Sequence, residues 1–266
     1  MDTVATPPAD PIIHPTAIVD PTAELASGVV VGPYAIIESR VRVGEGTRID
    51  SHARLARDTR VGRANRIGHG AVLGTEPQDI TYRDEPTWLE IGDRNIIREY
   101  ATLHRGTQSS GKTSVGHDNF IMAYAHVAHD CRIGNHVTLV NSVNMAGHVT
   151  IDDWAVLGGL VPVHQFVHIG CHAMIAGGFR VSQDVAPYAL TAGQPLHVVG
   201  LNIVGLRRRG FQAAQLSPLR SAFRVLFKSE LNTTQALDRV TAEVELTAEV
   251  HHLVEFIRAS ERGVTK

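Results

Sequence analysis

The sequence of 266 residues is poor in aromatic side chains and in cysteine, which argues against an aromatic core and against a disulfide-stabilised fold. Phe, Trp and Tyr together make up 5% of the chain, so any core must be built mainly from Val, Ile, Leu and Ala. The 2 cysteines lie 40 positions apart, which argues against a framework of disulfide bonds and favours a reducing compartment. The formal net charge of −2 argues against a nucleic-acid-coating protein or a long acidic tail.

Long apolar runs are also missing. No stretch approaches the roughly 18 apolar residues of a membrane-spanning helix, and the Pro-rich segment at residues 1–11 lacks the apolar centre of a signal peptide. A composition of 43% hydrophobic and 20% charged residues is ordinary for a globular protein. We therefore expect a soluble, cytoplasmic protein with a flexible segment at 1–11, no integral membrane segment and no nucleic-acid partner.

The sequence does contain a strict six-residue repeat. A large aliphatic residue occupies 26 of the 29 positions found at every sixth residue from Ile13 to Val181, where overall composition would give about 12 by chance. A small or β-branched residue stands two positions earlier, and Gly often follows. A period of six fits neither a helix nor an irregular β-sandwich, but it suits short strands with corners between them. The sequence therefore predicts a β-solenoid at residues 12–189.

The repeat fails at Asp79, Glu85 and Ser109, where the sequence becomes polar. We interpret the surrounding segments, 74–90 and 104–114, as loops that leave the solenoid. Loops on such a scaffold often carry function.

The repeat stops at about Pro187. Ser217 followed by Pro218 predicts the start of an amphipathic helix, because Ser is a good cap and Pro suits the first helical position. Threonines at 233, 234 and 247 are candidate caps for two more helices. A helical domain at residues 190–266 is thus expected to close the solenoid.

A basic patch accompanies this domain. Between Arg180 and Ser229 the chain has 7 basic residues and 1 acidic residue. Scattered arginines are usually a solvated face, but the three consecutive arginines 207–209 cannot all lie on one solvent face. The patch therefore favours an anionic partner or substrate.

Several motifs resemble a known family. The hexapeptide repeats and the stretches "AYAHVAHDCRIGN", "MAGHVTIDDWAVLGG", "VHQFVHIG" and "GLNIVGLRRRGF" resemble the acyl-carrier-protein-dependent UDP-N-acetylglucosamine O-acyltransferases of lipid A biosynthesis. The resemblance runs from about Ile13 to the C-terminal helices. It implies a mainly β fold, a left-handed parallel β-helix with three hexads per coil and a C-terminal α-helical domain, despite the usual right-handed crossover rule.

The resemblance also implies an activity and partners. The expected enzyme is a homotrimer with active sites between subunits. It would move an (R)-3-hydroxyacyl group from acidic acyl carrier protein to the 3-hydroxyl of UDP-N-acetylglucosamine, the first committed step of lipid A synthesis. Two matters stay open: the length of the acyl chain, and whether the acceptor carries a 3-hydroxyl or a 3-amino group.

With three hexads per coil, residues 18 apart stack about 4.8 Å apart. His129 then stacks on Gly147, and Gly147 stacks on Gln165. His126, His129 and Asp130 lie outside the inward positions and are expected to face outward, whereas Cys131 is expected to be buried core.

His129 has three interpretations. It is a solvated histidine, a ligand in a zinc site of the trimeric β-helix carbonic anhydrase type, or a general base beside a backbone amide that stabilises an oxyanion. An ordinary histidine pKa near 6.5 suits a base at neutral pH. Only the third interpretation accounts for Gly147 as well, and the resemblance favours it. A zinc-dependent hydratase and a non-catalytic β-helix binding module remain the alternatives.

The family's functional residues map onto this sequence as follows. The resemblance implies His129 as base and Gly147 as oxyanion donor, and Asp130 or another acceptor is expected to fix the tautomer of His129. The substrate-binding candidates are His126, His148, His164 and Gln165 on the site wall, Gln78 and Asp79 on a loop reaching a neighbouring subunit's site, Gly177 in the acyl groove, and Asn202, Arg208 and Arg209 at the nucleotide. No metal and no cofactor are implied, because a thiolate leaves without a separate acid.

Two positions depart from the family pattern. Thr81 stands where a Lys is common, and Val204 stands where a Glu is common. These changes concern affinity for the nucleotide sugar rather than the type of reaction.

Overall fold

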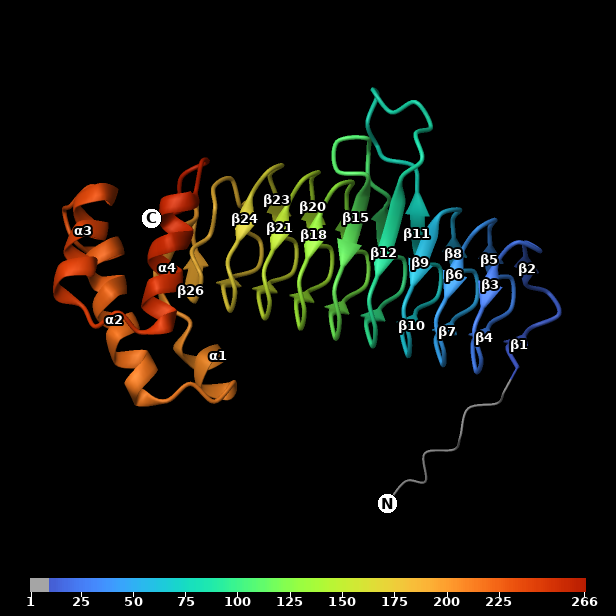
Figure 1. Ribbon diagram of the computed structural model, residues 1–266, viewed down its shortest axis with the longest axis horizontal. Helices are drawn as coiled ribbons and strands as arrows, with labels where there is room; N and C mark the ends of the chain where they lie inside the picture. The colour runs from blue at the N-terminus through green and yellow to red at the C-terminus, as the bar shows by residue number, and fades with distance from the viewer. Residues whose placement is uncertain (1–9) are drawn as a thin grey trace, which may run out of the picture.

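The chain forms a β-solenoid closed at one end by helices, as shown by a computed structural model that describes residues 10–266 (Figure 1). Strands in neighbouring coils pair in parallel, with Ile12 opposite Val30 and Ile13 opposite Val31, so one coil takes up 18 residues. This register confirms three hexads per coil. The expected flexible segment 1–11 lies outside the described residues at positions 1–9.

The strands form three sheets, one for each face of the solenoid. Sheet A contains β1 (Ile12–Ile13), β4 (Val30–Val31), β7 (Arg48–Ile49), β10 (Arg66–Ile67), β13 (Ile96–Ile97), β16 (Phe120–Ile121), β19 (Thr138–Leu139), β22 (Val156–Leu157), β25 (Met174–Ile175), β26 (Ala189–Ala192) and β27 (His197–Leu201). Sheet B contains β2 (Ile18–Val19), β5 (Ile36–Ile37), β8 (Arg54–Leu55), β11 (Val72–Thr75), β14 (Thr102–His104), β17 (His126–Val127), β20 (Asn144–Met145) and β23 (Pro162–Val163). Sheet C contains β3 (Glu24–Leu25), β6 (Arg42–Val43), β9 (Thr59–Val61), β12 (Trp88–Ile91), β15 (Lys112–Val115), β18 (Arg132–Ile133), β21 (Thr150–Ile151) and β24 (His168–Ile169).

Each hexad contributes two inward residues and a sharp corner. In β17 the large Val127 and the preceding small Ala125 are fully buried, while His126 between them points outward. At the corners the chain turns through a left-handed backbone conformation, with φ of 61° at Tyr124 and 60° at Asp130. The repeat therefore fixes which residues line the core and which reach the outer faces.

Two loops leave the solenoid on the same side (Figure 1). Residues 76–87 connect β11 to β12, and residues 105–111 connect β14 to β15. The coils continue in register beyond both insertions, with Arg66 opposite Ile96 across the first and Ile96 opposite Phe120 across the second. Arg105, which is buried, links the loops because its Nε donates to the Tyr82 hydroxyl at 3.1 Å.

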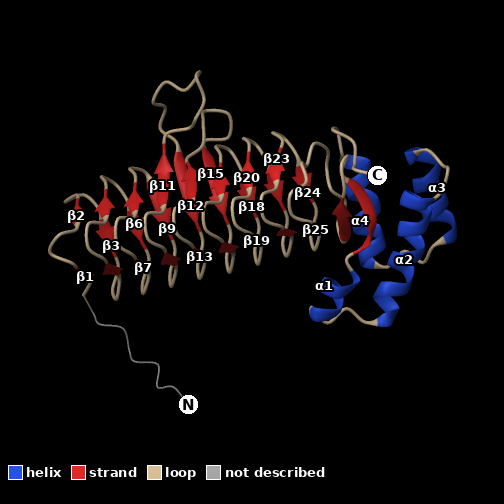
Figure 2. Ribbon diagram, turned by 180° about the vertical axis from the view of Figure 1, so that it is seen from behind, coloured by secondary structure: helices blue, strands red, loops and turns tan. Residues whose placement is uncertain are grey.

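The C-terminal part begins with strands rather than helices. β26 and β27 form an antiparallel hairpin that continues sheet A into the segment where the sequence predicted a helical domain. The helices then follow and pack at the end of the solenoid (Figure 2). They are α1 (Ile203–Arg208), α2 (Ala213–Lys228), α3 (Thr233–Glu243) and α4 (Ala248–Ala259).

The predicted helix start at Ser217 and Pro218 is wrong. α2 begins at Ala213, and Pro218 lies inside it. The reason is that the chain turns into the helix at Gln212, before Ser217 is reached. The Gln215 side chain accepts the Gln212 N–H at 3.0 Å, and the Gln215 N–H donates to the Gln212 carbonyl at 3.1 Å. The predicted cap at Thr247 is confirmed for α4. The cap of α3 is Asn232, one residue before the predicted Thr233.

Among the described residues, no helix is both long enough and apolar enough to cross a bilayer.

Candidate active site

The site is built where sheet B turns into sheet C. This corner carries His129 in one coil, Gly147 in the next and Gln165 in the one after, so the stacking predicted from the repeat is confirmed for the first pair. The His129 ring lies directly over Gly147, and its side chain is 14% exposed. Cys131 follows and points into the core. Burial raises the pKa of its thiol to about 12, so it cannot serve as a nucleophile.

Position 147 has room only for glycine, because the His129 ring fills the space that a side chain would need. A Cβ added there would lie 2.6 Å from Cε1 and 2.8 Å from Nε2 of His129, so any side chain would displace the ring. The backbone N–H of Gly147 donates no hydrogen bond to any residue between 10 and 266, whereas the next amide, that of His148, is paired with the His129 carbonyl at 3.0 Å. Gly147 thus presents a free donor beside the imidazole.

Asp130 does not face solvent, and this corrects the prediction that it would. Its side chain leaves the core as predicted, but the loop at 105–111 covers it completely. Thr107 donates its backbone N–H at 2.9 Å and its hydroxyl at 2.8 Å to the carboxylate, and the hydroxyl of Ser110 donates as well. The function of this loop is therefore partly to hold Asp130.

The carboxylate of Asp130 fixes the protonation pattern of His129. His129 Nδ1 lies 2.7 Å from Asp130 Oδ2. Burial alone would raise the pKa of Asp130, but hydrogen bonds from Ser110, His129 and Thr107 outweigh it and lower the pKa below the ordinary value. An ionised carboxylate only accepts, so Nδ1 carries the proton and Nε2 keeps a free lone pair. This is the arrangement of a general base.

A cavity of about 780 Å³ opens in front of this corner. It brings together six of the thirteen residues that the sequence predicted for the site. Its lining includes Gln78, His126, His129, Gly147, His164 and Gln165, together with Thr102 and Arg180, which the prediction did not include. Gln78 lines the cavity of its own protomer, whereas the resemblance implied a neighbour's site.

His148 stands behind the cavity rather than on its wall. Its ring stacks on Phe166 at 4.5 Å between centroids and meets His129 edge-on at 5.3 Å. Its Nε2 lies 3.6 Å from Asp130 Oδ2. His148 therefore supports the base and its carboxylate from the next coil.

His126 is held as a neutral donor or acceptor. Burial, together with nearby His129, lowers its pKa, and burial lowers the pKa of the adjoining His104 to about 4. Thr102 Oγ1 lies 2.7 Å from His126 Nδ1 and fixes the ring. His126 can thus position a substrate without adding charge.

This corner is a poor binding site for a metal ion. His129, Asp130 and His148 each offer one ligand atom, and these atoms lie within 4.8 Å of one another. However, both oxygens of Asp130 already accept hydrogen bonds from the protein. Only the free Nε2 of His129 faces the cavity, whereas a zinc site needs three ligands around one open position.

Asp79 lies on the other loop, where hydrogen bonds from Thr81 lower its pKa, and His129 is near enough to be a smaller cause. The larger causes are the N–H and hydroxyl of Thr81, which both donate to Asp79 Oδ1 at 2.8 Å. Thr81 therefore supplies Asp79 with two neutral donors.

The predicted nucleotide residues lie elsewhere in the protomer. Asn202, Arg208 and Arg209 line a cavity of about 700 Å³ against the outer face of sheet A. The Arg209 guanidinium stacks over Trp154 at 4.8 Å. The Asn202 side chain caps α1 and donates to the His172 carbonyl at 2.9 Å, so each of its polar atoms has one partner within the protein. Val204 lines the same cavity.

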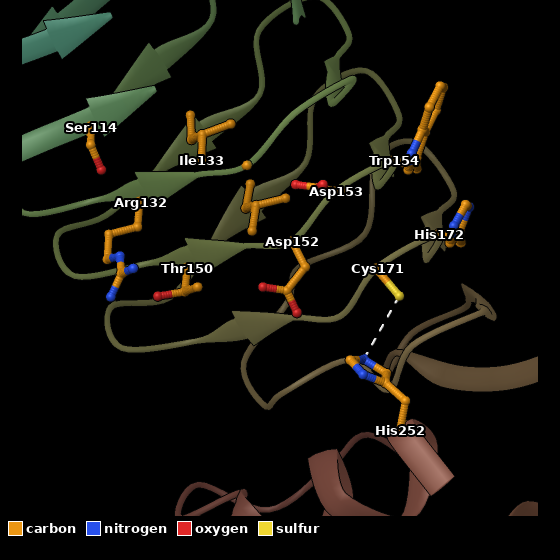
Figure 3. A pocket seen from close by; sticks show the side chains of 12 residues that line it. Ser114, Arg132, Ile133, Thr150, Asp152, Asp153, Trp154, Cys171, His172 and His252 are labelled. Carbon is orange, nitrogen blue, oxygen red and sulfur yellow. Dashed lines mark hydrogen bonds between the residues drawn. The ribbon is translucent and has the colours of Figure 1, made fainter. Parts of the chain in front are cut away.

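A third cavity, of about 640 Å³, lies between sheet C and α4 (Figure 3). Cys171 and His252 face each other across it at 3.7 Å. Burial raises the pKa of Cys171 to about 11 and lowers the pKa of His172 to about 4. A thiolate is therefore not available there at neutral pH, and the His129 corner is the better reactive site.

Known proteins match this chain along nearly its whole length. A family model described as Udp N-acetylglucosamine O-acyltransferase, Domain 2, matches residues 184–265, and a model of bacterial transferase hexapeptide repeats matches residues 112–147. The acyl-[acyl-carrier-protein]--UDP-N-acetylglucosamine O-acyltransferase of Burkholderia lata is 55% identical over 259 residues, covering 96% of this chain and 99% of that protein.

Solved structures agree. LpxA from Bacteroides fragilis, a UDP-N-acetylglucosamine acyltransferase, has a TM-score of 0.95 at 41% identity. LpxA from Acinetobacter baumannii has a TM-score of 0.93 at 42% identity. Each comparison covers 96% of this chain and 100% of the other. The predicted fold class, a left-handed β-helix with a helical C-terminal part, is confirmed.

Proposed function

This chain belongs to the acyl-carrier-protein-dependent UDP-N-acetylglucosamine O-acyltransferases, and on that premise we propose that the corner formed by His129, Asp130 and Gly147 is its catalytic site. The reaction transfers an acyl group from acyl carrier protein to UDP-N-acetylglucosamine in lipid A synthesis. One observation carries the assignment. A histidine whose Nδ1 is fixed by a buried carboxylate lies directly over a backbone N–H with no other partner.

The geometry supports a two-step acyl transfer. Nε2 of His129 accepts the proton of the sugar 3-hydroxyl while that oxygen attacks the thioester carbonyl. The negative charge that develops on the carbonyl oxygen is stabilised by the N–H of Gly147. As the intermediate collapses, the C–S bond breaks and the departing carrier thiolate takes the proton back from His129. Asp130 stabilises the imidazolium between the two steps.

The remaining cavity residues serve the substrates. His126, His164 and Gln165 present polar atoms on the wall beside the base, and Gln78 and Asp79 approach from the loop. We assign them to positioning the sugar and the thioester. His148 holds the corner from behind. No metal or cofactor takes part in this scheme, and the two free cysteines fit a reducing cytoplasm.

We also propose a homotrimer, because the outer faces of the solenoid differ in how polar their outward residues are. The outward residues of sheet C include Glu24, Arg42, Arg60, Glu90 and Arg132, which suit solvent. Those of sheet A include the exposed Ile96 and the half-buried Phe120, Val156 and Met174, which follow the exposed Arg48 and Arg66 along the same face. The corner between sheets A and B carries exposed Tyr34, Tyr100, Tyr124 and Leu160. Exposed apolar surface of this extent indicates an interface.

A three-fold axis along this corner would place sheet B of one protomer against sheet A of the next. The outer edge of sheet B, with His129, would then meet the outer edge of sheet A, with Trp154 and Arg209 from the neighbour. Two cavities that are separate in one protomer would form a single site. The Arg208 and Arg209 guanidinium groups suit the diphosphate of the nucleotide.

Mixing two inactive variants tests this arrangement. Trimers made only of His129→Ala, or only of an Arg208→Ala, Arg209→Ala double variant, are expected to be nearly inactive at a fixed substrate concentration. Co-expressed at equal levels, they should recover about a quarter of wild-type activity. The reason is that a quarter of the interfaces then pair an intact His129 with intact arginines from the neighbour. No recovery in demonstrably mixed trimers would place both halves of the site in one protomer.

Gly177 is expected to set the length of the acyl chain. It lies at the corner between sheets A and B, at the inner end of the proposed interface, and it is exposed. We expect glycine there to leave room for a long 3-hydroxyacyl chain and Gly177→Met to shift preference to shorter donors. A Cβ at this position would lie 2.9 Å from the Gly159 carbonyl oxygen, so Gly177→Ala is the control for backbone displacement. The measurement is relative kcat/KM over a series of donors, and an unchanged profile in the Met variant would move the groove elsewhere.

Acyl carrier protein is acidic, and α2 offers a complementary surface. Arg220, Arg224 and Lys228 recur every fourth residue and are exposed. An apolar cavity of about 220 Å³ lies beside them, between α2 and β27. We assign this face to docking of the carrier, because opposite charge raises the rate of encounter.

Mass spectrometry of the product tests the function itself. The protein is incubated with UDP-N-acetylglucosamine and a panel of 3-hydroxyacyl carrier proteins. We expect one added hydroxyacyl group that hydroxylamine removes, as from an ester. In a parallel incubation with the 3-amino analogue of the nucleotide sugar, a hydroxylamine-resistant product, with none from UDP-N-acetylglucosamine, would make the enzyme an N-acyltransferase. Binding without turnover of any donor would favour the non-catalytic module.

A further inference from the structure

The segment that follows α4 reaches back to the site wall. Ser260 donates its hydroxyl to Asp184 Oδ2 at 2.6 Å, and the backbone of Gly263 and Thr265 brackets Asp184, with hydrogen bonds of 3.1 and 2.8 Å. Val264 and Thr265 are buried. The segment is thus bound firmly along residues 182–185.

Arg262 connects this segment to the cavity. Its Nε donates to the Ser182 carbonyl at 3.0 Å, which fixes the guanidinium plane. Its Nη2 lies 2.8 Å from Nδ1 of His164, a residue 98 positions earlier that lines the same cavity as His129. Arg262 itself lines only the neighbouring cavity of about 470 Å³, so it approaches His164 from behind the wall.

The contact determines the tautomer of His164. Arginine has only donors and stays charged, so His164 Nδ1 must accept and cannot carry a proton. The Gln165 carbonyl oxygen, 3.1 Å from the same nitrogen, would need Nδ1 as donor. The two contacts exclude each other. The arginine contact is the shorter and cannot reverse, so the proton of the neutral ring lies on Nε2.

We propose that Arg262 is a positioning residue of the acyl-transfer site, holding His164 so that its Nε2–H is presented to an acceptor oxygen of the bound sugar or acyl group. His129 and His164 then have opposite hydrogen-bonding roles in this cavity. Asp130 makes His129 Nε2 an acceptor, and Arg262 makes His164 Nε2 a donor. This inference rests on the proposed function for the identity of the substrate, but not for the tautomer.

The test uses the full-length protein and variants that separate positioning from folding. Arg262→Met keeps an apolar stem and removes the donor. We expect kcat/KM to fall about 10–100-fold, the size of one charge-assisted hydrogen bond. Arg262→Lys should recover part of this loss. Ser260→Ala is the matched control, because it loosens the same segment without touching His164, and it should keep most of the activity.

Two readouts distinguish action through His164 from a structural role. In a double-mutant cycle, His164→Ala combined with Arg262→Met should be no slower than His164→Ala alone. In histidine-selective ¹⁵N NMR, the resonances lost in His164→Ala should show the Nε2–H tautomer in the wild type and a mixture of tautomers in Arg262→Met.

Additive losses in the cycle, an equal loss in Ser260→Ala, or an unchanged tautomer in Arg262→Met would overturn the proposal. A wild-type protein without acyl transfer would instead count against the proposed function. The NMR result does not depend on turnover and would still decide the role of Arg262.

Discussion

Replacing His129 with alanine is expected to lower kcat/KM for acyl transfer by roughly 10²–10⁴-fold, the usual contribution of a general base. The reason is that His129 Nε2 is the only lone pair at this corner held free and directed to the cavity. Asp130 is fully covered, and His148 stands behind it. Neither of these two side chains can take over the proton.

The fold should tolerate this change. Asp130 keeps its hydrogen bonds from Thr107 and Ser110 when the imidazole is removed. The melting temperature and the oligomeric state are therefore expected to change little. His251→Ala, at an exposed histidine on α4, is the control and should be indistinguishable from wild type. A fall of only a few-fold in His129→Ala would remove His129 from the role of base.

The zinc alternative is tested in the same preparations. Chelators should leave the transferase activity of the wild type unchanged. Zinc bound at one ion per site and lost in His129→Ala would instead support the hydratase, because three ligand atoms do lie close together at this corner.

The sequence predicts the solenoid well because one physical constraint repeats in every coil. A side chain such as Val127 must fill the core, and the next coil must stack on it at the spacing of a sheet. The pairing of residues 18 apart follows from this alone, and it places the His129 ring over Gly147 before any coordinates are known.

What the repeat cannot predict are contacts made by segments outside it. The burial of Asp130 depends on Thr107 and Ser110, which lie on a loop without periodicity. Only the failed hexad position at Ser109 pointed to that loop. The contact of Arg262 with His164 spans 98 positions and leaves no local signal. These contacts determine which ring nitrogen of His129 and of His164 carries a proton. The chemistry of the site therefore depends on the loop at 105–111 and on the segment after α4.

Asp130→Asn is expected to be almost as damaging as the loss of His129 itself, roughly 10²–10⁴-fold in kcat/KM. Asn has the same shape, so the change is one of hydrogen-bond direction. Oδ1 of Asp130 accepts from the Thr107 N–H, and Oδ2 accepts from His129 Nδ1. The new amide will therefore keep its oxygen on Thr107 and aim its NH₂ group at His129. Nδ1 then becomes an acceptor, the ring proton moves to Nε2, and the base is lost while the imidazole stays in place.

Steady-state kinetics and acid unfolding together check this account. Ser110→Ala, which removes one donor from the other carboxylate oxygen, is the control for loosening of the loop and should keep most of the activity. Because the folded-state pKa of Asp130 is lowered, its charge stabilises the wild type above an unfolded pKa of about 4, and this advantage is lost as the pH falls through the lower folded value. The stability difference between wild type and Asp130→Asn should therefore shrink below about pH 4. If Asp130→Asn were to keep near-normal kcat/KM at neutral pH, the carboxylate would not be setting the tautomer of the base.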